Sequence, residues 1–210
     1  MRERDNKCFW QRFARLYGPV MKSSRGVYEE VGRRMEPYLG QNMNVLELAC
    51  GSGQLSFLLA KRVHLWEATD FSEAMIEEAK KRGRPRSLHF SVQDATCLPY
   101  ASGSFDAVVI SNGLHIMPHP ETALTEISRV LKPGGLLLAP TFVRKEGKGP
   151  GLRIHMMELM GFRTFYKWDK AGFIAYLEEH GFGMMEQELL EGGMAPLCFA
   201  AARTAASGHV

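Results

Sequence analysis

Apolar and polar positions along the chain follow two periods, one typical of helices and one typical of buried strands. Apolar residues recur every three or four positions over 6–21 and 27–39, which predicts two amino-terminal helices. Short apolar runs typical of strands then alternate with amphipathic segments typical of helices. The apolar runs are 44–49, 64–70, 88–93, 107–110 and 136–141, and the amphipathic segments are 53–62, 73–82 and 120–131. This alternation predicts an α/β fold with a parallel sheet covered by helices on both faces.

The carboxyl-terminal part departs from this alternation. A helix is predicted at 170–180, ending at Gly181, and two strand-like runs follow at 184–190 and 196–202. The glycine-containing segment between the two runs predicts an antiparallel hairpin. We therefore expect a doubly wound, mainly parallel sheet of seven strands, closed at one edge by this hairpin.

Composition places the chain among ordinary globular proteins. Its 210 residues, 45% of them hydrophobic, suit one domain with a substantial core. The net charge of +3 gives no reason to expect nucleic acid as a partner. Basic residues concentrate in 1–34 and 144–170, which suits an anionic substrate, a membrane surface or simply solvated helix faces.

The cysteines and the apolar runs bear on location. The four cysteines lack both CxxC spacing and the Cys/His spacing of zinc sites, which predicts a reduced protein without a metal. The first residues lead into no signal-peptide core, and no apolar run is long enough to cross a bilayer. We therefore expect a soluble cytoplasmic protein; its oligomeric state is open.

The most informative chemistry lies in the loop after the first predicted strand. Residues 45–55 form an apolar run, a turn of small residues and the start of a helix. Gly51 and Gly53 remove side chains where a ligand would approach the backbone, and the helix would direct its free N–H groups at that ligand. Asp70 ends the next apolar run, where a carboxylate suits the two hydroxyls of a ribose. For the loop alone, a plain strand–helix turn is the alternative.

Several segments, by their order and spacing, carry a resemblance to a known family. They are 47–53 (ELACGSG), 68–72 (ATDFS) with Met75, 93–100 (QDATCLPY), 103–109 (GSFDAVV), 112–115 (NGLH) and 129–135 (RVLKPGG). Together they resemble the class I S-adenosylmethionine-dependent methyltransferases over residues 9–202. The resemblance is closest to the small-molecule branch that includes enzymes of ubiquinone and menaquinone biosynthesis. It implies a Rossmann-like fold and S-adenosylmethionine as the cofactor.

The resemblance also implies roles for single residues. Glu47 would fix the glycine turn or receive the cofactor's ammonium group, Asp70 would hold both ribose hydroxyls, and Asp94 would accept from the adenine amino group. Other residues would contact or cover the methionine, ribose or adenine parts. They are Tyr17, Ala49, Gly51, Gly53, Phe71, Met75, Ala95, Leu98, Ser111 and Asn112. Backbone capping is an alternative role for Asp94 and Ser111, and core packing is one for Met75.

Two positions depart from the family pattern. Ala49 stands where many relatives have glycine, and Gln54 replaces a frequent third glycine. These departures bear on how closely the cofactor lies against the start of the helix, not on whether it binds.

Methyl transfer from a sulfonium is an in-line displacement, so the protein must chiefly align the nucleophile and exclude water. His115 is the first candidate for a base because it follows the fourth strand and because an unperturbed imidazole titrates near neutrality. A wall residue without proton transfer is the alternative. His155, in a segment rich in aromatic residues and methionine, is the second candidate.

The resemblance divides a single domain, 1–210, into four parts. They are a helical cover (1–40), a cofactor-binding core (41–141), a substrate lid (142–170) and a closing helix and hairpin (171–202). The lid either roofs a pocket for a small apolar or aromatic methyl acceptor or simply packs on the sheet. Two other functions stay open: a non-catalytic methyltransferase-like binding module and a nicotinamide-dependent oxidoreductase, whose fingerprint also begins with paired glycines.

Overall fold

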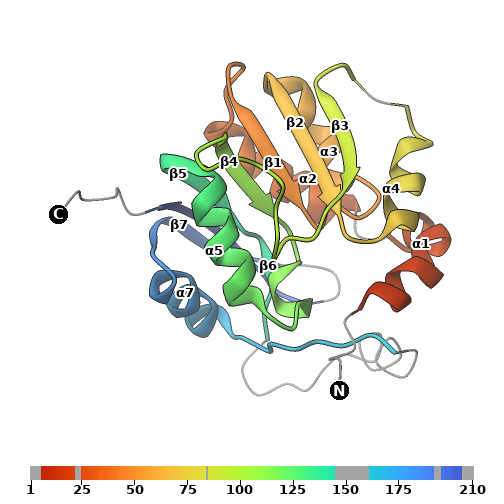
Figure 1. Ribbon diagram of the computed structural model, residues 1–210. Helices are drawn as coiled ribbons and strands as arrows, with labels where there is room; N and C mark the ends of the chain where they lie inside the picture. The colour runs from red at the N-terminus through yellow and green to blue at the C-terminus, as the bar shows by residue number, and fades with distance from the viewer. Residues whose placement is uncertain (1–5, 22–24, 84, 145–160, 192–194, 205–210) are drawn as a thin grey trace.

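A computed structural model describes most of the chain and shows one sheet with helices on both faces (Figure 1). The described residues are 6–21, 25–83, 85–144, 161–191 and 195–204, with the backbone alone for 15–21. The strands are β1 (Asn44–Leu48), β2 (Leu65–Asp70), β3 (Leu88–Val92), β4 (Phe105–Ile110), β5 (Leu131–Leu138), β6 (Thr141–Phe142), β7 (Phe182–Leu190) and β8 (Leu197–Thr204). The α-helices are α1 (Lys7–Met21), α2 (Arg25–Met35), α3 (Gln54–Leu59), α4 (Glu73–Lys80), α5 (Pro120–Val130) and α7 (Lys170–Glu179). The short 3₁₀ turns are η2 (Glu36–Tyr38), η3 (Ala60–Arg62) and η4 (Leu114–Ile116).

The strand order explains where a ligand can bind. The sheet runs β3–β2–β1–β4–β5–β8–β6, with β7 on the other edge of β8. β1 pairs in parallel with both β2 and β4, so the order reverses between β1 and β4. In open α/β sheets this switch point is where ligands bind, at the carboxyl ends of the strands. The predicted doubly wound, mainly parallel sheet and its closing antiparallel hairpin are confirmed.

The sheet contains an eighth strand in addition to the seven predicted. The predicted run 136–141 is divided: β5 ends at Leu138, and the two-residue β6 begins at Thr141. Pro140 lies between them and has no N–H to donate to a ladder, which explains the interruption. β6 then pairs antiparallel with the start of β8.

The core lies on both faces of the sheet, as the fully apolar β4 predicts. Val108 and Ile110 face one cluster, which packs under α5 and α7. Ala107 and Val109 face a second cluster, which packs under α2, α3 and α4. In Figure 1, α5 lies in front of the sheet and α2 and α3 lie behind it. Among the described residues, no helix is both long and apolar enough to span a membrane.

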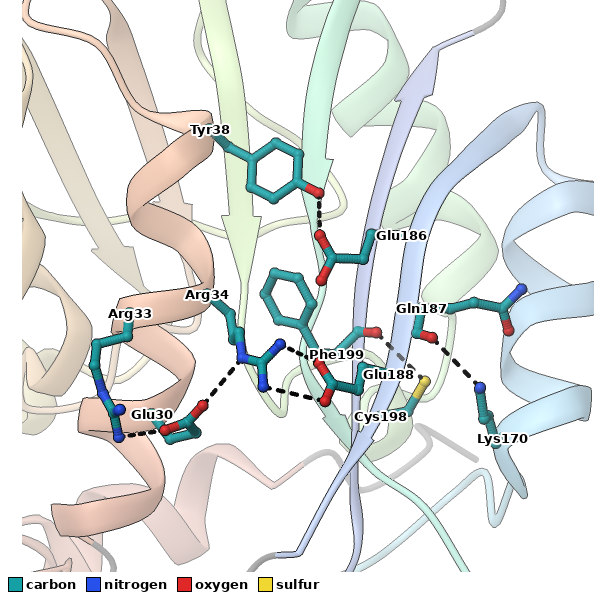
Figure 2. A network of polar contacts seen from close by, with 10 residues as sticks. All are labelled: Glu30, Arg33, Arg34, Tyr38, Lys170, Glu186, Gln187, Glu188, Cys198 and Phe199. Carbon is teal, nitrogen blue, oxygen red and sulfur yellow. Dashed lines mark hydrogen bonds and ion pairs between the residues drawn. The ribbon is translucent and has the colours of Figure 1, made fainter.

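Polar contacts fasten the edge strand β7 to α2 and its 3₁₀ extension (Figure 2). Arg34 pairs with Glu188 on β7 and with Glu30 one turn earlier in its own helix. The Tyr38 hydroxyl donates to Glu186 at 2.5 Å. Burial, with Glu186 beside it, raises the pKa of Tyr38 to about 12, so the hydroxyl stays a donor. These contacts hold the hairpin to α2 and its 3₁₀ extension.

Candidate functional site

The loops that follow β1 and β4 meet at the switch point. Gly113, just before η4, packs against the loop after β1: a Cβ at this glycine would lie 2.8 Å from Ile110 Cγ1 and 3.1 Å from Ala49 Cβ. Asn112 accepts a hydrogen bond from the Phe142 N–H at 2.9 Å through its side-chain oxygen. The tertiary fold therefore brings Ala49 and Asn112, both predicted to contact a cofactor, to adjacent loops.

The glycine loop is a tight, left-handed turn. Gly51 and Gly53 have φ values of 55° and 83°, a region that only glycine enters at little cost. A Cβ at Gly53 would approach Phe57 to 2.9 Å and Phe90 to 3.1 Å. Ala49 also has a positive φ, 53°, although it carries a Cβ. Ala49, which stands where many relatives have glycine, therefore occupies a strained backbone position.

Replacing Ala49 by glycine is expected to raise the free energy of unfolding by about 1 kcal/mol, because glycine adopts this φ without strain. The midpoint of urea unfolding measures the effect. Ala175→Gly, at an exposed position inside α7, is the matched control, and it should instead lose about 1 kcal/mol of helix stability. Destabilisation by both variants would contradict the assignment of strain to Ala49.

Glu47, near the end of β1, is a buried carboxylate with 2% of its surface exposed. Its Oε2 atom accepts hydrogen bonds from Ser56 Oγ at 2.5 Å and from Trp66 Nε1 at 2.7 Å. Burial raises the pKa of Glu47 to about 7, and the nearby charge of Asp70 adds to the rise, while the two hydrogen bonds oppose it. The carboxyl group therefore changes charge near neutrality.

A small pocket opens beside Glu47. It is lined by Tyr28, Glu47, Ala49, Cys50, Gln54, Leu55 and Ser111. Glu47, Ala49 and Ser111 were predicted site residues, and the fold brings them together here. The other four lining residues were not predicted. Cys50, Gln54 and Leu55 lie in or next to the glycine loop, so their closeness in sequence to Gly51 and Gly53 could have indicated them. Tyr28 comes from α2 and carries no sequence signal.

Asp70, at the end of β2, links two loops of the site. It is 7% exposed, and its two oxygens accept from the backbone N–H groups of Gly51 and Ser72, each at 2.9 Å. Burial raises the pKa of Asp70 to about 6, although these backbone hydrogen bonds oppose the rise. Asp70 therefore holds the glycine loop to the start of α4, and each oxygen keeps a further lone pair for a ligand.

The loop after β3 places Asp94 next to Asp70. The Gln93 N–H donates to the Asp70 carbonyl at 3.1 Å, which brings the following residue to the same edge of the sheet. Asp94 is exposed, and its Oδ1 atom accepts from the Thr96 N–H at 2.9 Å and from the Thr96 hydroxyl at 2.7 Å. Both the predicted adenine contact and the alternative capping role of Asp94 fit this geometry.

The residues predicted around adenine differ in exposure. Phe71 is half-buried, whereas Met75 on α4 is 2% exposed. Ala95 and Leu98 are buried in the cluster under α5 and α7. The predicted contacts of these residues with a cofactor stay predictions.

His115 lies in η4, directly after the loop that follows β4. Its carbonyl oxygen accepts from the N–H groups of Phe165 at 3.0 Å and Tyr166 at 3.1 Å. The residue is half-buried, but its Nδ1 atom is buried and has no hydrogen-bond partner in the described part of the chain. Burial lowers the pKa of His115 to about 4, so the imidazole is neutral at neutral pH. A neutral ring with an unused nitrogen can accept or donate one hydrogen bond.

Aromatic residues of α1 and of the segment 161–168 cover this edge of the sheet. Phe162 contacts Phe9 and Trp10 of α1, with ring centroids 5.3 and 5.6 Å apart. In Figure 1 the cyan segment runs from α7 along the lower edge of the molecule toward α1. Part of the predicted lid therefore packs against the predicted helical cover. His155 lies outside the described residues, and for Tyr17 only the helical backbone is described.

Comparisons with known proteins agree with this geometry. Residues 46–139 match the model of a family described as a methyltransferase domain. A demethylmenaquinone methyltransferase of Clavibacter sepedonicus is 42% identical over 112 residues, covering 52% of this chain and 44% of that protein. The chain spans less than half the length of the curated relatives it matches.

Solved structures agree with the fold. The match to the complex of the Haloferax volcanii Trm112 methyltransferase activator with a methyltransferase has a TM-score of 0.81 at 18% identity, covering 97% of this chain and 99% of that one. The match to the magnesium protoporphyrin IX methyltransferase of Synechocystis, with bound SAH, has a TM-score of 0.67 at 19% identity and covers 89% of this chain and 87% of that one.

Proposed function

We propose that this chain is a class I S-adenosylmethionine-dependent methyltransferase that transfers a methyl group to a small apolar or aromatic acceptor; the match of residues 46–139 to a methyltransferase domain and the fold support this. The observation that carries the proposal is the pair of buried carboxylates, Glu47 and Asp70, on either side of the left-handed glycine loop at the switch point. The similarity to a demethylmenaquinone methyltransferase and to a magnesium protoporphyrin IX methyltransferase supports a small-molecule acceptor.

The residues at the switch point fit S-adenosylmethionine. Glu47 supplies a carboxylate beside the small pocket for the ammonium group, and Asp70 has free lone pairs for the ribose hydroxyls. Asp94 has a carboxylate oxygen left for the adenine amino group. Gly51 gives the loop a left-handed turn beside the Asp70 carboxylate. The missing side chain at Gly53 makes room for Phe57 and Phe90. When bound, the cofactor supplies a methyl carbon activated by the positive sulfur.

The chain's own residues would align the acceptor and take its proton. His115, neutral at neutral pH, would orient an acceptor hydroxyl by a hydrogen bond or accept its proton; burial, which lowers the pKa of His115 to about 4, makes the ring a weak base and favours the orienting role. Phe9, Trp10 and Phe162 would exclude water from the same edge of the sheet. In this proposal 41–141 binds the cofactor, while 1–40 and 142–170 cover it and the acceptor.

The family match removes the reason to consider a nicotinamide-dependent oxidoreductase, because the same residues 46–139 belong to a methyltransferase domain. A non-catalytic binding module stays an outcome of the test below. A cytoplasmic location also stays a prediction.

Turnover tests the proposal directly. The full chain is incubated with S-adenosylmethionine and a panel of phenols, quinols, thiols, amines and lipids, and S-adenosylhomocysteine is measured as the product. We expect turnover with at least one aromatic hydroxyl compound. Binding of the cofactor without turnover of any acceptor would identify a binding module instead, and absence of binding in calorimetry would refute the cofactor assignment.

The affinity for S-adenosylmethionine is expected to rise about tenfold between pH 6 and pH 8. In the free protein, burial holds the pKa of Glu47 at about 7, above its ordinary value of 4.5. The positive cofactor favours the carboxylate, so binding below that pKa must release a proton. Above about pH 8 the affinity should fall again, because the α-ammonium group of the cofactor then loses its own proton. Asp70, with a pKa of about 6, acts in the same direction. Calorimetry in two buffers of different ionisation enthalpy measures both the affinity and the proton release.

Glu47→Gln is the matched control, because the amide oxygen can still accept from Ser56 and Trp66. The variant should bind more weakly at pH 8 and lose most of the pH dependence. An affinity of the unmodified chain that stays constant or falls over this range would contradict a carboxylate role for Glu47.

A further inference from the structure

Asn6, just before α1, is a buried polar side chain that no part of the proposed chemistry uses. It is 1% exposed. Its Nδ2 group donates to the carbonyl oxygens of Ile116 at 2.9 Å and Arg163 at 2.8 Å, and its Oδ1 atom accepts from the Arg163 N–H at 2.8 Å. One amide thus joins three chain segments that lie 110 and 157 positions apart.

The partners of Asn6 surround His115. Ile116 is the next residue in η4, and Arg163 belongs to the segment whose Phe165 and Tyr166 N–H groups bind the His115 carbonyl. The backbone around His115 is therefore tied to 161–168 from two sides, directly and through Asn6. The imidazole itself makes no such contact, since its Nδ1 atom is buried and unpartnered in the described part of the chain.

Helix α1, which begins directly after Asn6, also reaches the cofactor side of the site. Lys7 pairs with Glu73 at 2.9 Å, and Gln11 donates to the same carboxylate. Glu73 begins α4 directly after Ser72, whose N–H binds Asp70. Asn6 and the first turns of α1 thus connect the turn at Asp70 with the turn at His115.

We infer that Asn6 is a positioning residue for methyl transfer: its side chain holds the turn that carries His115 against residues 161–168, so that the imidazole keeps its place when the acceptor binds. The catalytic part of this inference rests on the proposed function. The geometric part does not, because it concerns only contacts within the chain. The Asn6 side chain makes its hydrogen bonds with Ile116 and Arg163, whereas Lys7 and Gln11 hold α1 to Glu73 without it. Loss of the Asn6 amide should therefore loosen the His115 turn and change cofactor affinity little.

Asn6→Leu is the decisive variant, because leucine has the same branched arrangement of four side-chain heavy atoms as asparagine and makes none of the three hydrogen bonds. Asn42→Leu, at an exposed asparagine in the turn before β1, is the matched control. Amide hydrogen exchange of Phe165 and Tyr166 should become at least about tenfold faster in Asn6→Leu and stay unchanged in Asn42→Leu. Histidine NMR titration should show the pKa of His115 rising from about 4 toward 6.5 as water reaches the ring.

Kinetics test the catalytic part with any acceptor that the panel reveals. We expect Asn6→Leu to lower kcat at least about tenfold, with the affinity for S-adenosylmethionine within about threefold of the unmodified chain. A merely structural role would lower the melting temperature while kcat of the folded protein stayed constant, and that result would overturn the inference. Unchanged exchange and unchanged His115 titration would overturn it without any turnover assay. If Asn6→Leu does not fold, Asn6→Ser carries the same expectations.

The two proposals fail in different ways. If the unmodified chain turns over no acceptor, the proposed function fails, whereas the exchange and titration results still decide whether Asn6 holds the His115 turn. If turnover is found but Asn6→Leu keeps the kcat of the unmodified chain, only the positioning role fails.

Discussion

Replacing Asp70 by alanine is expected to weaken S-adenosylmethionine binding at least about tenfold and to lower the free energy of unfolding by about 1–3 kcal/mol. The loss of affinity follows from removing the charged acceptor for the ribose hydroxyls. The loss of stability follows from the structure, because the buried N–H groups of Gly51 and Ser72 lose their acceptor. The sequence alone predicts the loss of affinity, with little change in folding. The expected loss of stability comes from the contacts of Asp70 with both loops in the structure.

Calorimetry and urea unfolding separate the two effects. Asp106→Ala is the matched control, since Asp106 also accepts a backbone N–H, that of Asn44 at 2.8 Å, but lies at the opposite edge of the sheet. It should destabilise the protein without changing cofactor affinity. Unchanged affinity in Asp70→Ala would refute the ribose assignment, and unchanged stability would refute the role of Asp70 in holding the glycine loop.

Replacing His115 by alanine is expected to lower kcat about 10²-fold or more for an acceptor that carries a proton, while cofactor affinity stays constant. The structure sharpens the expected pH dependence. Because burial lowers the pKa of His115 to about 4, its neutral form predominates throughout the neutral range. Protonation of His115 should therefore not reduce kcat between about pH 8 and pH 6.

Acceptors of different acidity distinguish a base from a wall residue. The loss in His115→Ala should be smaller for acceptors that are already ionised, such as thiols of low pKa. His119→Ala is the control, because His119 is exposed close to the same loop, and it should leave kcat unchanged. If His115→Ala turns over a protonated acceptor at the normal rate, transfer relies on alignment alone.

Local sequence patterns determined the elements and the cofactor loop. The apolar runs predicted β1 to β4 within a few residues, since the side-chain periods of strands and helices are properties of short segments. The glycines at 51 and 53 indicated a tight turn of small residues, and in the structure both have left-handed backbone. The position of Asp70 at a strand end indicated proximity to the loop, and its carboxylate does bind the Gly51 N–H.

The tertiary structure alone decided which polar groups are buried and which distant segments touch. The residues near Asn6 in the sequence do not predict its contacts with Ile116 and Arg163, and those near His115 do not predict that its pKa is about 4. The strain at Ala49 likewise comes from a turn closed by contacts with other strands. The burial and the hydrogen bonds of a polar side chain depend on atoms brought together from across the chain, so local periodicity does not predict them.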